Sequence, residues 1–103
     1  MGMKYASVLA LALFIVPAAQ ASEELAKKYN CLACHQMDKK LVGPSYQDVA
    51  AKYKDEADAA TTLAAKIKNG GVGVWGQIPM PPNPNISDAD LDTLTAWILE
   101  MAN

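Results

Sequence analysis

The sequence predicts an all-α domain of about four short helices. Four segments carry apolar residues at the three- and four-residue spacing of amphipathic helices. Residues 70–86 separate the last two of these segments, and there glycines alternate with apolar residues before a run rich in proline. Such a composition forms neither a helix nor a central strand, so it predicts a long, stiff loop. No segment has a convincing strand pattern, which leaves all-α as the expected fold class.

The first 21 residues have the pattern of a secretory signal peptide. Lys4 supplies a basic start, residues 6–16 are almost wholly apolar, and residues 19–21 (Ala-Gln-Ala) match a small-x-small cleavage site. An apolar run of 11 residues is shorter than the roughly 20 that a membrane-spanning helix requires. We therefore expect export to the periplasm, removal of residues 1–21, no membrane anchor, and a mature domain of residues 22–103.

The first helix of the mature chain is expected to begin at Ser22. A serine suits the N-cap position, and the two acidic residues after it suit the positive end of a helix. Leu25, Tyr29 and Leu32 then follow at helical spacing. The helix is therefore expected to run into the cysteine motif that begins at Cys31.

Three more helices are expected further along the chain. A Gly-Pro pair interrupts the sequence before a short second helix between Tyr46 and Tyr53. An alanine-rich third helix is expected from about Ala57 to Lys68, where Asn-Gly-Gly closes it. The last helix is expected to start at Ser87 with a capping-box-like pattern. Its buried stripe consists of Leu91, Leu94, Trp97, Ile98 and Met101.

The mature chain is small and acidic. It has eight lysines and eleven acidic residues, and this net negative charge argues against nucleic-acid binding. Residues 22–68 carry all eight lysines, whereas residues 69–103 carry four acidic residues and no lysine, an asymmetry that can steer a charged partner. A domain of this size buries too small a core to be more than marginally stable, so a staple or a cofactor is expected.

The segment Cys31-Leu32-Ala33-Cys34-His35 has the C-x-x-C-H pattern of covalent haem attachment. The spacing has a mechanical reason, because one helical turn presents both thiols to two vinyl groups on the same edge of a haem. His35 comes next in the chain, where its imidazole can become the proximal axial ligand of the iron. We therefore expect one haem c, attached through Cys31 and Cys34.

Other interpretations of the two cysteines are open. A structural zinc site has four ligands, and the chain has no further cysteine or histidine with which to complete one. A disulfide between Cys31 and Cys34 would close almost no loop and add little stability. A redox-active dithiol of the thioredoxin type is the main alternative, although the βαβ framework that it needs is not found in the sequence.

The second axial ligand must be of another residue type, because His35 is the only histidine. Met37 is only two residues from His35 and can hardly reach the opposite face of a haem. Met101 continues the apolar stripe of the last helix, where filling the core is its expected role. Met80 lies among prolines in the stiff loop, which suits the task of holding a thioether against iron. The alternative is an ordinary methionine in a proline-rich turn.

A histidine–methionine pair predicts electron transfer. This ligation raises the reduction potential compared with two histidines, and it occupies both axial positions. A haem enzyme or gas sensor would instead need an open axial position and distal acid–base groups, and the sequence supplies no distal histidine. We therefore expect a one-electron carrier with no catalytic residues, and not an enzyme.

These residues resemble the small bacterial class I cytochromes c, periplasmic electron carriers that serve nitrite reductases and terminal oxidases. The resemblance covers essentially the whole mature chain. Beyond the C-x-x-C-H segment, it is carried by residues 42–44 (Val-Gly-Pro), 67–70 (Ile-Lys-Asn-Gly) and 73–83 (Gly-Val-Trp-Gly-Gln-Ile-Pro-Met-Pro-Pro-Asn). It implies the class I cytochrome c fold, in which a few helices wrap around one haem and the first and last helices cross.

The resemblance also implies roles for single residues. Met80 is then the distal ligand, and the backbone carbonyl of Pro44 accepts a hydrogen bond from the His35 ring. Three further residues are implied around the haem: Trp75 as an indole donor to a propionate, Lys66 near a propionate, and Asn83 hydrogen-bonded near the Met80 sulfur.

Partners are expected to dock transiently at an exposed haem edge. The resemblance implies nitrite reductase, a terminal oxidase or a peroxidase as acceptor, and a donor such as a bc1-type complex. The expected docking surface includes Val72, Val74 and Ile78, with lysines 27, 28, 39 or 40 on its rim. The carrier itself is expected to be a soluble monomer.

Overall fold

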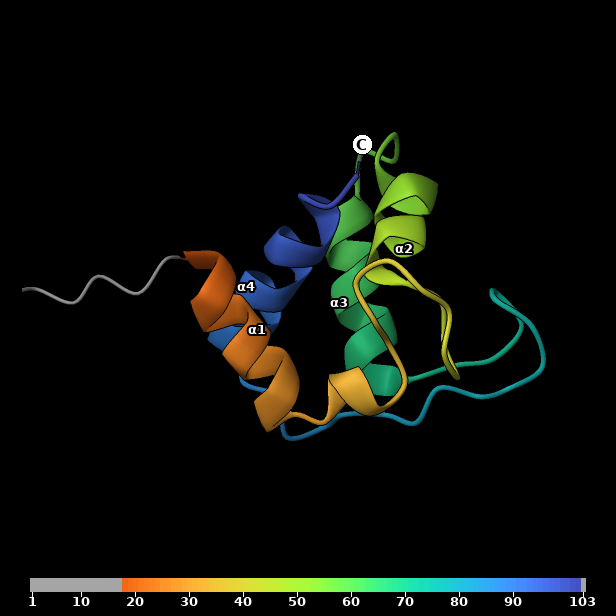
Figure 1. Ribbon diagram of the computed structural model, residues 1–103, viewed down its shortest axis with the longest axis horizontal. Coiled ribbons are helices and arrows are strands. Elements are labelled where there is room, and N and C mark those ends of the chain that lie inside the picture. Colours follow the sequence, from red (N-terminus) through yellow and green to blue (C-terminus); the bar gives the residue numbers. More distant parts are fainter. Residues whose placement is uncertain (1–17, 103) are drawn as a thin grey trace, which may run out of the picture.

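In the computed structural model, which describes residues 18–102, the chain folds into four α-helices and one turn of 3₁₀-helix (Figure 1). In chain order the elements are α1 (Ala18–Lys28), η1 (Cys31–Ala33), α2 (Tyr46–Tyr53), α3 (Ala59–Asn69) and α4 (Asp88–Leu99). Within the described range the β-type pairings are two isolated bridges, between residues 35 and 40 and between residues 71 and 80. The predicted all-α class is confirmed.

Helix α4 organises the core, since it packs against α1, α2 and α3. In Figure 1 it passes behind α1 and lies beside α3. Its buried residues are Leu91, Leu94, Thr95, Trp97 and Ile98. A hydrogen bond of 2.6 Å from the Tyr29 hydroxyl to the Asp90 carboxylate also joins the end of α1 to the start of α4.

The prediction for the first helix is wrong at both ends. Helix α1 begins at Ala18, upstream of Ser22, and Ser22 is buried within the helix instead of capping it. Residues 18–21 are Ala-Ala-Gln-Ala, which are strong helix formers, so the helix extends through them. The helix ends at Lys28 before it reaches the cysteines. Asn30 takes the left-handed conformation with φ 60°, and this turns the chain into the separate η1 turn.

The other three helices lie close to their predicted positions. Ser45 and Ser87 cap α2 and α4, each accepting a hydrogen bond from a backbone N–H three residues later, at 3.1 and 3.2 Å. Helix α3 ends at Asn69 and is capped by Gly70, whose φ of 68° favours glycine. Met101 lies just beyond α4 and packs against the core, as expected of a core filler.

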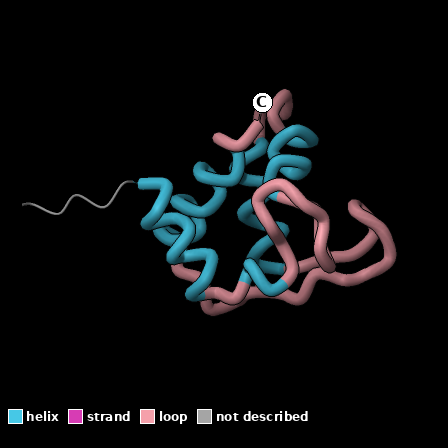
Figure 2. The backbone as a smooth tube through the Cα atoms, in the orientation of Figure 1, coloured by secondary structure: helices cyan, strands magenta, loops and turns pink. Residues whose placement is uncertain are grey.

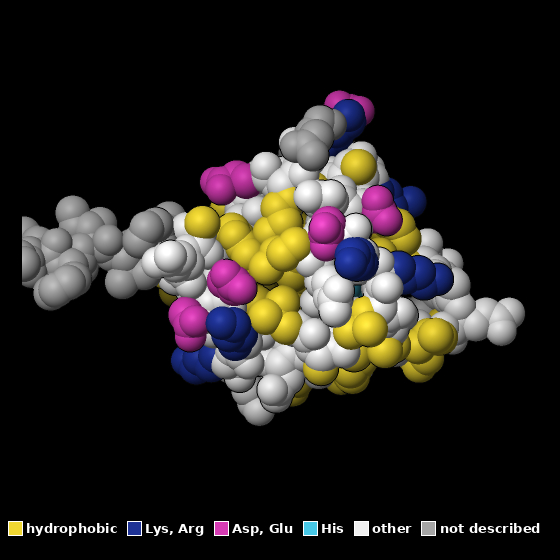
Figure 3. Space-filling view, viewed as in Figure 1, with side chains coloured by type: hydrophobic (Ala, Val, Ile, Leu, Met, Phe, Trp, Pro, Cys, Tyr) yellow, Lys and Arg dark blue, Asp and Glu magenta, His cyan; other side chains and the backbone are white. Residues whose placement is uncertain are grey.

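Two long loops gather on one side of the helices (Figure 2). One joins η1 to α2, and the other is the predicted stiff loop, residues 70–86. Residues 71–79 are exposed, but the loop is tied to the end of α3 because the Asn83 N–H donates to the carbonyls of Ile67 and Lys68 at 3.2 and 3.0 Å. Hydrophobic side chains gather along the edge that the loops form (Figure 3). The helices therefore lie on one side of an interior space, and the two loops lie on the other.

The expected signal peptide stays a prediction, because residues 1–17 lie outside the described part of the chain. The expected cleavage site, residues 19–21, lies exposed at the start of α1. Among the helices of residues 18–102, none is long and apolar enough to cross a membrane.

Candidate haem-attachment site

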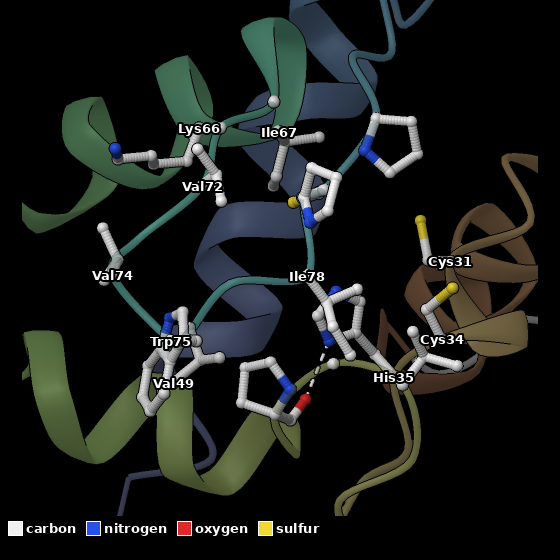
Figure 4. Close-up of a pocket in the computed structure, with 18 of the residues that line it drawn as sticks. Cys31, Cys34, His35, Val49, Lys66, Ile67, Val72, Val74, Trp75 and Ile78 are labelled. Carbon is white, nitrogen blue, oxygen red and sulfur yellow. Dashed lines mark hydrogen bonds between the residues drawn. The ribbon is translucent and has the colours of Figure 1, made fainter.

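A cavity of about 420 Å³ lies between the helices and the two loops. Its volume is within the range of about 300 to 1,000 Å³ that is typical of cofactor sites. Figure 4 shows Cys31, Cys34 and His35 along one side of it, with Lys66 and Val74 at the other. The lining is mostly apolar and includes Val42, Val49, Ile67, Val72, Val74, Ile78, Leu94 and Ile98. The space therefore suits a largely apolar group.

The two cysteines lie on one wall of this cavity. Cys31 is the first residue of η1 and Cys34 is its C-cap, so the short helix separates the two thiols by a single turn. Both thiols are free, and both line the cavity. Burial raises the pKa of the Cys31 thiol, although its interaction with the Tyr46 hydroxyl opposes this shift. The pair is placed to bond to two groups on one edge of the same ligand.

His35 is held with one ring nitrogen occupied. Its Nδ1 lies 2.7 Å from the carbonyl oxygen of Pro44, so Nδ1–H donates and Nε2 keeps a free lone pair (Figure 4). The structure therefore has the hydrogen bond that the resemblance implies. Gly43 packs so closely that a Cβ there would lie 2.6 Å from the ring Cε1. A neutral imidazole with a free Nε2 is the form that binds a metal ion.

Tyr46 also belongs to the site, although the sequence indicated only a core residue of α2. Its ring stacks on the His35 ring with centroids 5.4 Å apart and an interplanar angle of 22°. Burial raises the pKa of the Tyr46 phenol well above its usual range, and the neighbouring Cys31 raises it further. The phenol therefore stays protonated. The sequence feature that could have indicated this role is an aromatic residue two positions after Pro44.

Met80, the other expected ligand, lines the same cavity as His35. Its backbone pairs with Gly71, with N–H to carbonyl distances of 2.8 and 3.1 Å. Gly70 lies against the Met80 carbonyl so closely that a side chain at position 70 would collide with it. The backbone of Met80 is therefore held firmly beside the end of α3, whereas its bond to iron stays a prediction.

Lys66 and Trp75 line the side of the cavity away from the cysteines (Figure 4). Trp75 is 44 % exposed, and the Nζ of Lys52 lies 5.6 Å from the centroid of its ring, within cation–π range. Lys52 and Trp75 could not be linked from the sequence, because α2 and the loop meet only in the folded chain. Contacts of Lys66 and Trp75 with a propionate stay predictions.

Asn83 ties the loop to α3. Its side-chain amide donates to the carbonyl oxygens of Ile67 at 3.0 Å and Pro81 at 3.4 Å. The Pro81 carbonyl belongs to the segment that carries Met80, and the Ile67 carbonyl belongs to α3. The predicted contact of Asn83 with the Met80 sulfur stays a prediction.

This donor set fits a covalently attached haem. Two free thiols and an imidazole with an available nitrogen share one apolar cavity with a methionine, which is a common axial ligand of haem iron. A zinc site is a poor match for one histidine and two cysteines. The all-α fold and this site together define the class of c-type haem proteins.

Comparison with known proteins identifies the family. Residues 19–102 match the family model of cytochrome c. Cytochrome c-552 of Nitrosomonas europaea is 61 % identical over 92 residues, which cover 89 % of each chain. Cytochrome c-551 of Azotobacter vinelandii is 58 % identical over 80 residues, or 78 % of this chain and 96 % of that one. The crystal structure of wild-type Nitrosomonas europaea cytochrome c552 superposes with a TM-score of 0.75 at 63 % identity, covering 77 % of this chain and 98 % of that chain.

The chain belongs to the cytochrome c family, among the small single-haem class I cytochromes of the c-551 and c-552 type. It is therefore an electron carrier and not an enzyme, and its cofactor is haem c, attached through the C-x-x-C-H cysteines Cys31 and Cys34. The dithiol alternative is excluded by this assignment.

Proposed function

We propose that this cytochrome is a periplasmic one-electron carrier whose haem iron is bound by His35 and Met80. When bound, the haem supplies the redox centre, whose iron alternates between the ferrous and ferric states. One observation carries the proposal: the free Nε2 of His35 and the side chain of Met80 belong to the cavity that also holds both attachment thiols.

The two proposed ligands are prepared in different ways. The Pro44 carbonyl keeps the proton on Nδ1 of His35, which would leave Nε2 free to bind the iron and would increase its basicity. Met80 depends on its backbone pairing with Gly71 and on the flanking prolines, which limit the freedom of the loop. A weak thioether donor held in this way loses little entropy when it binds. With both axial positions filled, the iron would exchange electrons without binding a substrate.

Lys66 and Trp75 are proposed to hold the haem propionates. An ammonium group and an indole N–H are both suitable donors to a carboxylate. Lys52 adds a second positive charge beside Trp75, so this corner of the cavity favours ionised propionates. The propionate edge would then point away from Cys31 and Cys34, which bond to the opposite edge.

Redox partners are proposed to dock on the loop side of the cavity. Val72 and Ile78 are 62 % and 66 % exposed, and with Val74 they form an apolar patch beside the haem site. Such a patch suits brief contact at short electron-transfer distance. The proposed acceptors are a nitrite reductase, a terminal oxidase or a peroxidase, with a donor such as a bc1-type complex, as the family resemblance implies.

Lysines in the neighbouring loop are proposed to orient the partner. Lys39 and Lys40 are exposed, and within residues 18–102 neither forms an ion pair, whereas Lys27 and Lys28 pair with acidic side chains at 3.4 and 3.8 Å. Replacing both loop lysines by glutamate should slow electron transfer to an acidic acceptor several-fold at low salt. Lys54→Glu, an exposed change at the end of α2, is the control. Equal rates for the two variants would refute this docking surface.

Export is proposed from the signal-type pattern of residues 1–21. Mass spectrometry of the protein isolated from a periplasmic extract should give a mature chain that starts at Ser22. Recovery of the intact precursor from the cytoplasm would contradict this part of the proposal.

The absorption spectrum of the ferric holoprotein tests the ligands. Haem should remain with the chain after denaturing extraction, and the native protein should show the weak far-red band of methionine bound to ferric iron. Met80→Ala should lose the band and lower the reduction potential, since histidine–methionine ligation raises it. Met101→Ala is the control, because Met101 packs against the core outside the cavity. A far-red band that survives in Met80→Ala would exclude Met80 as the ligand.

A further inference from the structure

Tyr46 lies where the proximal histidine, one attachment thiol and the helical core meet. It is the first residue of α2 and is only 3 % exposed. The His35 ring stacks on the Tyr46 ring, with ring centroids 5.4 Å apart. Trp97 of α4 meets it edge-on, with centroids 5.3 Å apart and an interplanar angle of 62°. Its hydroxyl interacts with the Cys31 thiol.

This stack restricts a motion that the Pro44 hydrogen bond alone leaves free. A single bond at Nδ1 fixes one point of the imidazole, but the ring can still tilt about that point. Tyr46 meets the ring by stacking, and Gly43 packs against its Cε1 edge. Because Trp97 braces Tyr46, the tilt of the imidazole is linked to the packing of α4 on α2. Close-packed cores resist such displacements.

We infer that Tyr46 is a positioning residue, whose ring sets the orientation of the His35 imidazole relative to the haem plane. The inference rests on the proposed function, in which His35 is an axial ligand. The orientation of an axial imidazole determines how unpaired spin is distributed over the pyrrole rings of a ferric haem. The spread of the haem-methyl proton resonances therefore responds to this orientation, together with that of the second axial ligand.

The test compares three variants of the ferric holoprotein by proton NMR. Tyr46→Phe keeps the ring and should retain the wild-type spread of the four haem-methyl resonances. Tyr46→Leu removes the stack and should change that spread. Leu63→Ala is the control for stability, because Leu63 belongs to the same core but does not line the cavity. It should lower the melting temperature and leave the haem-methyl spread unchanged.

An unchanged spread in Tyr46→Leu would overturn the inference and leave Tyr46 as a core residue. If Tyr46→Leu fails to mature, the ferrous wild-type protein provides the second measurement. Nuclear Overhauser contacts between the Tyr46 and His35 ring protons are then expected, and their absence would overturn the inference as well. Failure of the proposed function is recognised separately, because His35 ring protons without the large haem ring-current shift would show that His35 does not bind the iron.

Discussion

The two sides of the haem cavity are held by different kinds of contact. On the attachment wall, residues 31–46, the contacts act on the side chain of His35, whose ring donates a hydrogen bond to the Pro44 carbonyl and stacks on Tyr46. In the methionine loop, residues 70–83, Met80 is held mainly by backbone contacts. Met80 pairs with Gly71 through the main chain, and residues 71–79 are exposed. The proposed histidine ligand is therefore held by the core, and the proposed methionine ligand by the course of its own loop.

This difference predicts two kinds of defect. A change on the attachment wall should affect haem attachment and the whole fold, because that wall is continuous with α2 and α4. A change in the methionine loop should affect the iron–sulfur bond while the covalent haem stays in place.

The largest effect is expected from loss of both attachment thiols. The double variant Cys31→Ser/Cys34→Ser should carry no covalent haem and should be largely unfolded. Without the haem, the apolar side chains that line the cavity of about 420 Å³ lose the apolar surface against which they would be buried. A whole domain has only roughly 5 to 15 kcal/mol of net stability, so this loss is expected to unfold the chain.

Circular dichroism melting and haem staining after denaturing electrophoresis measure this outcome. Ala33→Ser, an exposed change inside the same η1 turn, is the control and should keep both the haem and the fold. A haem-free double variant that melts cooperatively would show that the helices are stable on their own.

The next largest effect is expected at Gly70, where the backbone packs closely against the methionine loop. Gly70→Ala should weaken or abolish the far-red band and reduce stability by about 2–4 kcal/mol, because the new Cβ collides with the Met80 carbonyl at a positive φ. Gly73→Ala is the control, since it also has a positive φ but has no atom within 4 Å of the added Cβ. It should cost only the backbone strain and keep the band. Covalent haem should remain in both variants, and similar spectra would show that the approach of Gly70 to Met80 is not needed.

The difference between local contacts and contacts made by the folded chain explains which helix ends could be predicted from the sequence. The cap at Ser87 was predicted correctly because it acts on a backbone N–H only three residues away, whereas the equivalent cap at Ser45 was not predicted. The start of α1 was not predicted correctly, because helix formers before Ser22 extend the helix past a residue that suits a cap. The break at Asn30 depends on a single left-handed residue, and asparagine adopts that conformation only occasionally, so its presence alone did not predict the break.

The site likewise has some features that could be predicted from the sequence and others that could not. The spacing of Cys31, Cys34 and His35 could be interpreted from the sequence because one turn of chain brings them together. The stack of Tyr46 on His35 could not, since it depends on where α2 packs. The same is true of Lys52 and Trp75, which are distant in the chain and meet only through the fold. Local chemistry was therefore predictable, whereas the contacts that orient it required the structure.

The smallest effect is expected at Asn83, which fastens the methionine loop without touching the attachment wall. Asn83→Ala removes side-chain hydrogen bonds to the Ile67 and Pro81 carbonyls, which should cost about 1–2 kcal/mol. The loop should then open more often, so an added exogenous ligand such as imidazole should replace the methionine faster, as followed by loss of the far-red band. Asn85→Ala, an exposed change just beyond the fastening, should react at the wild-type rate. If both variants react alike, the Asn83 side-chain amide does not restrain the loop, and the backbone hydrogen bonds of Met80 with Gly71 and of the Asn83 N–H with α3 are sufficient to hold it.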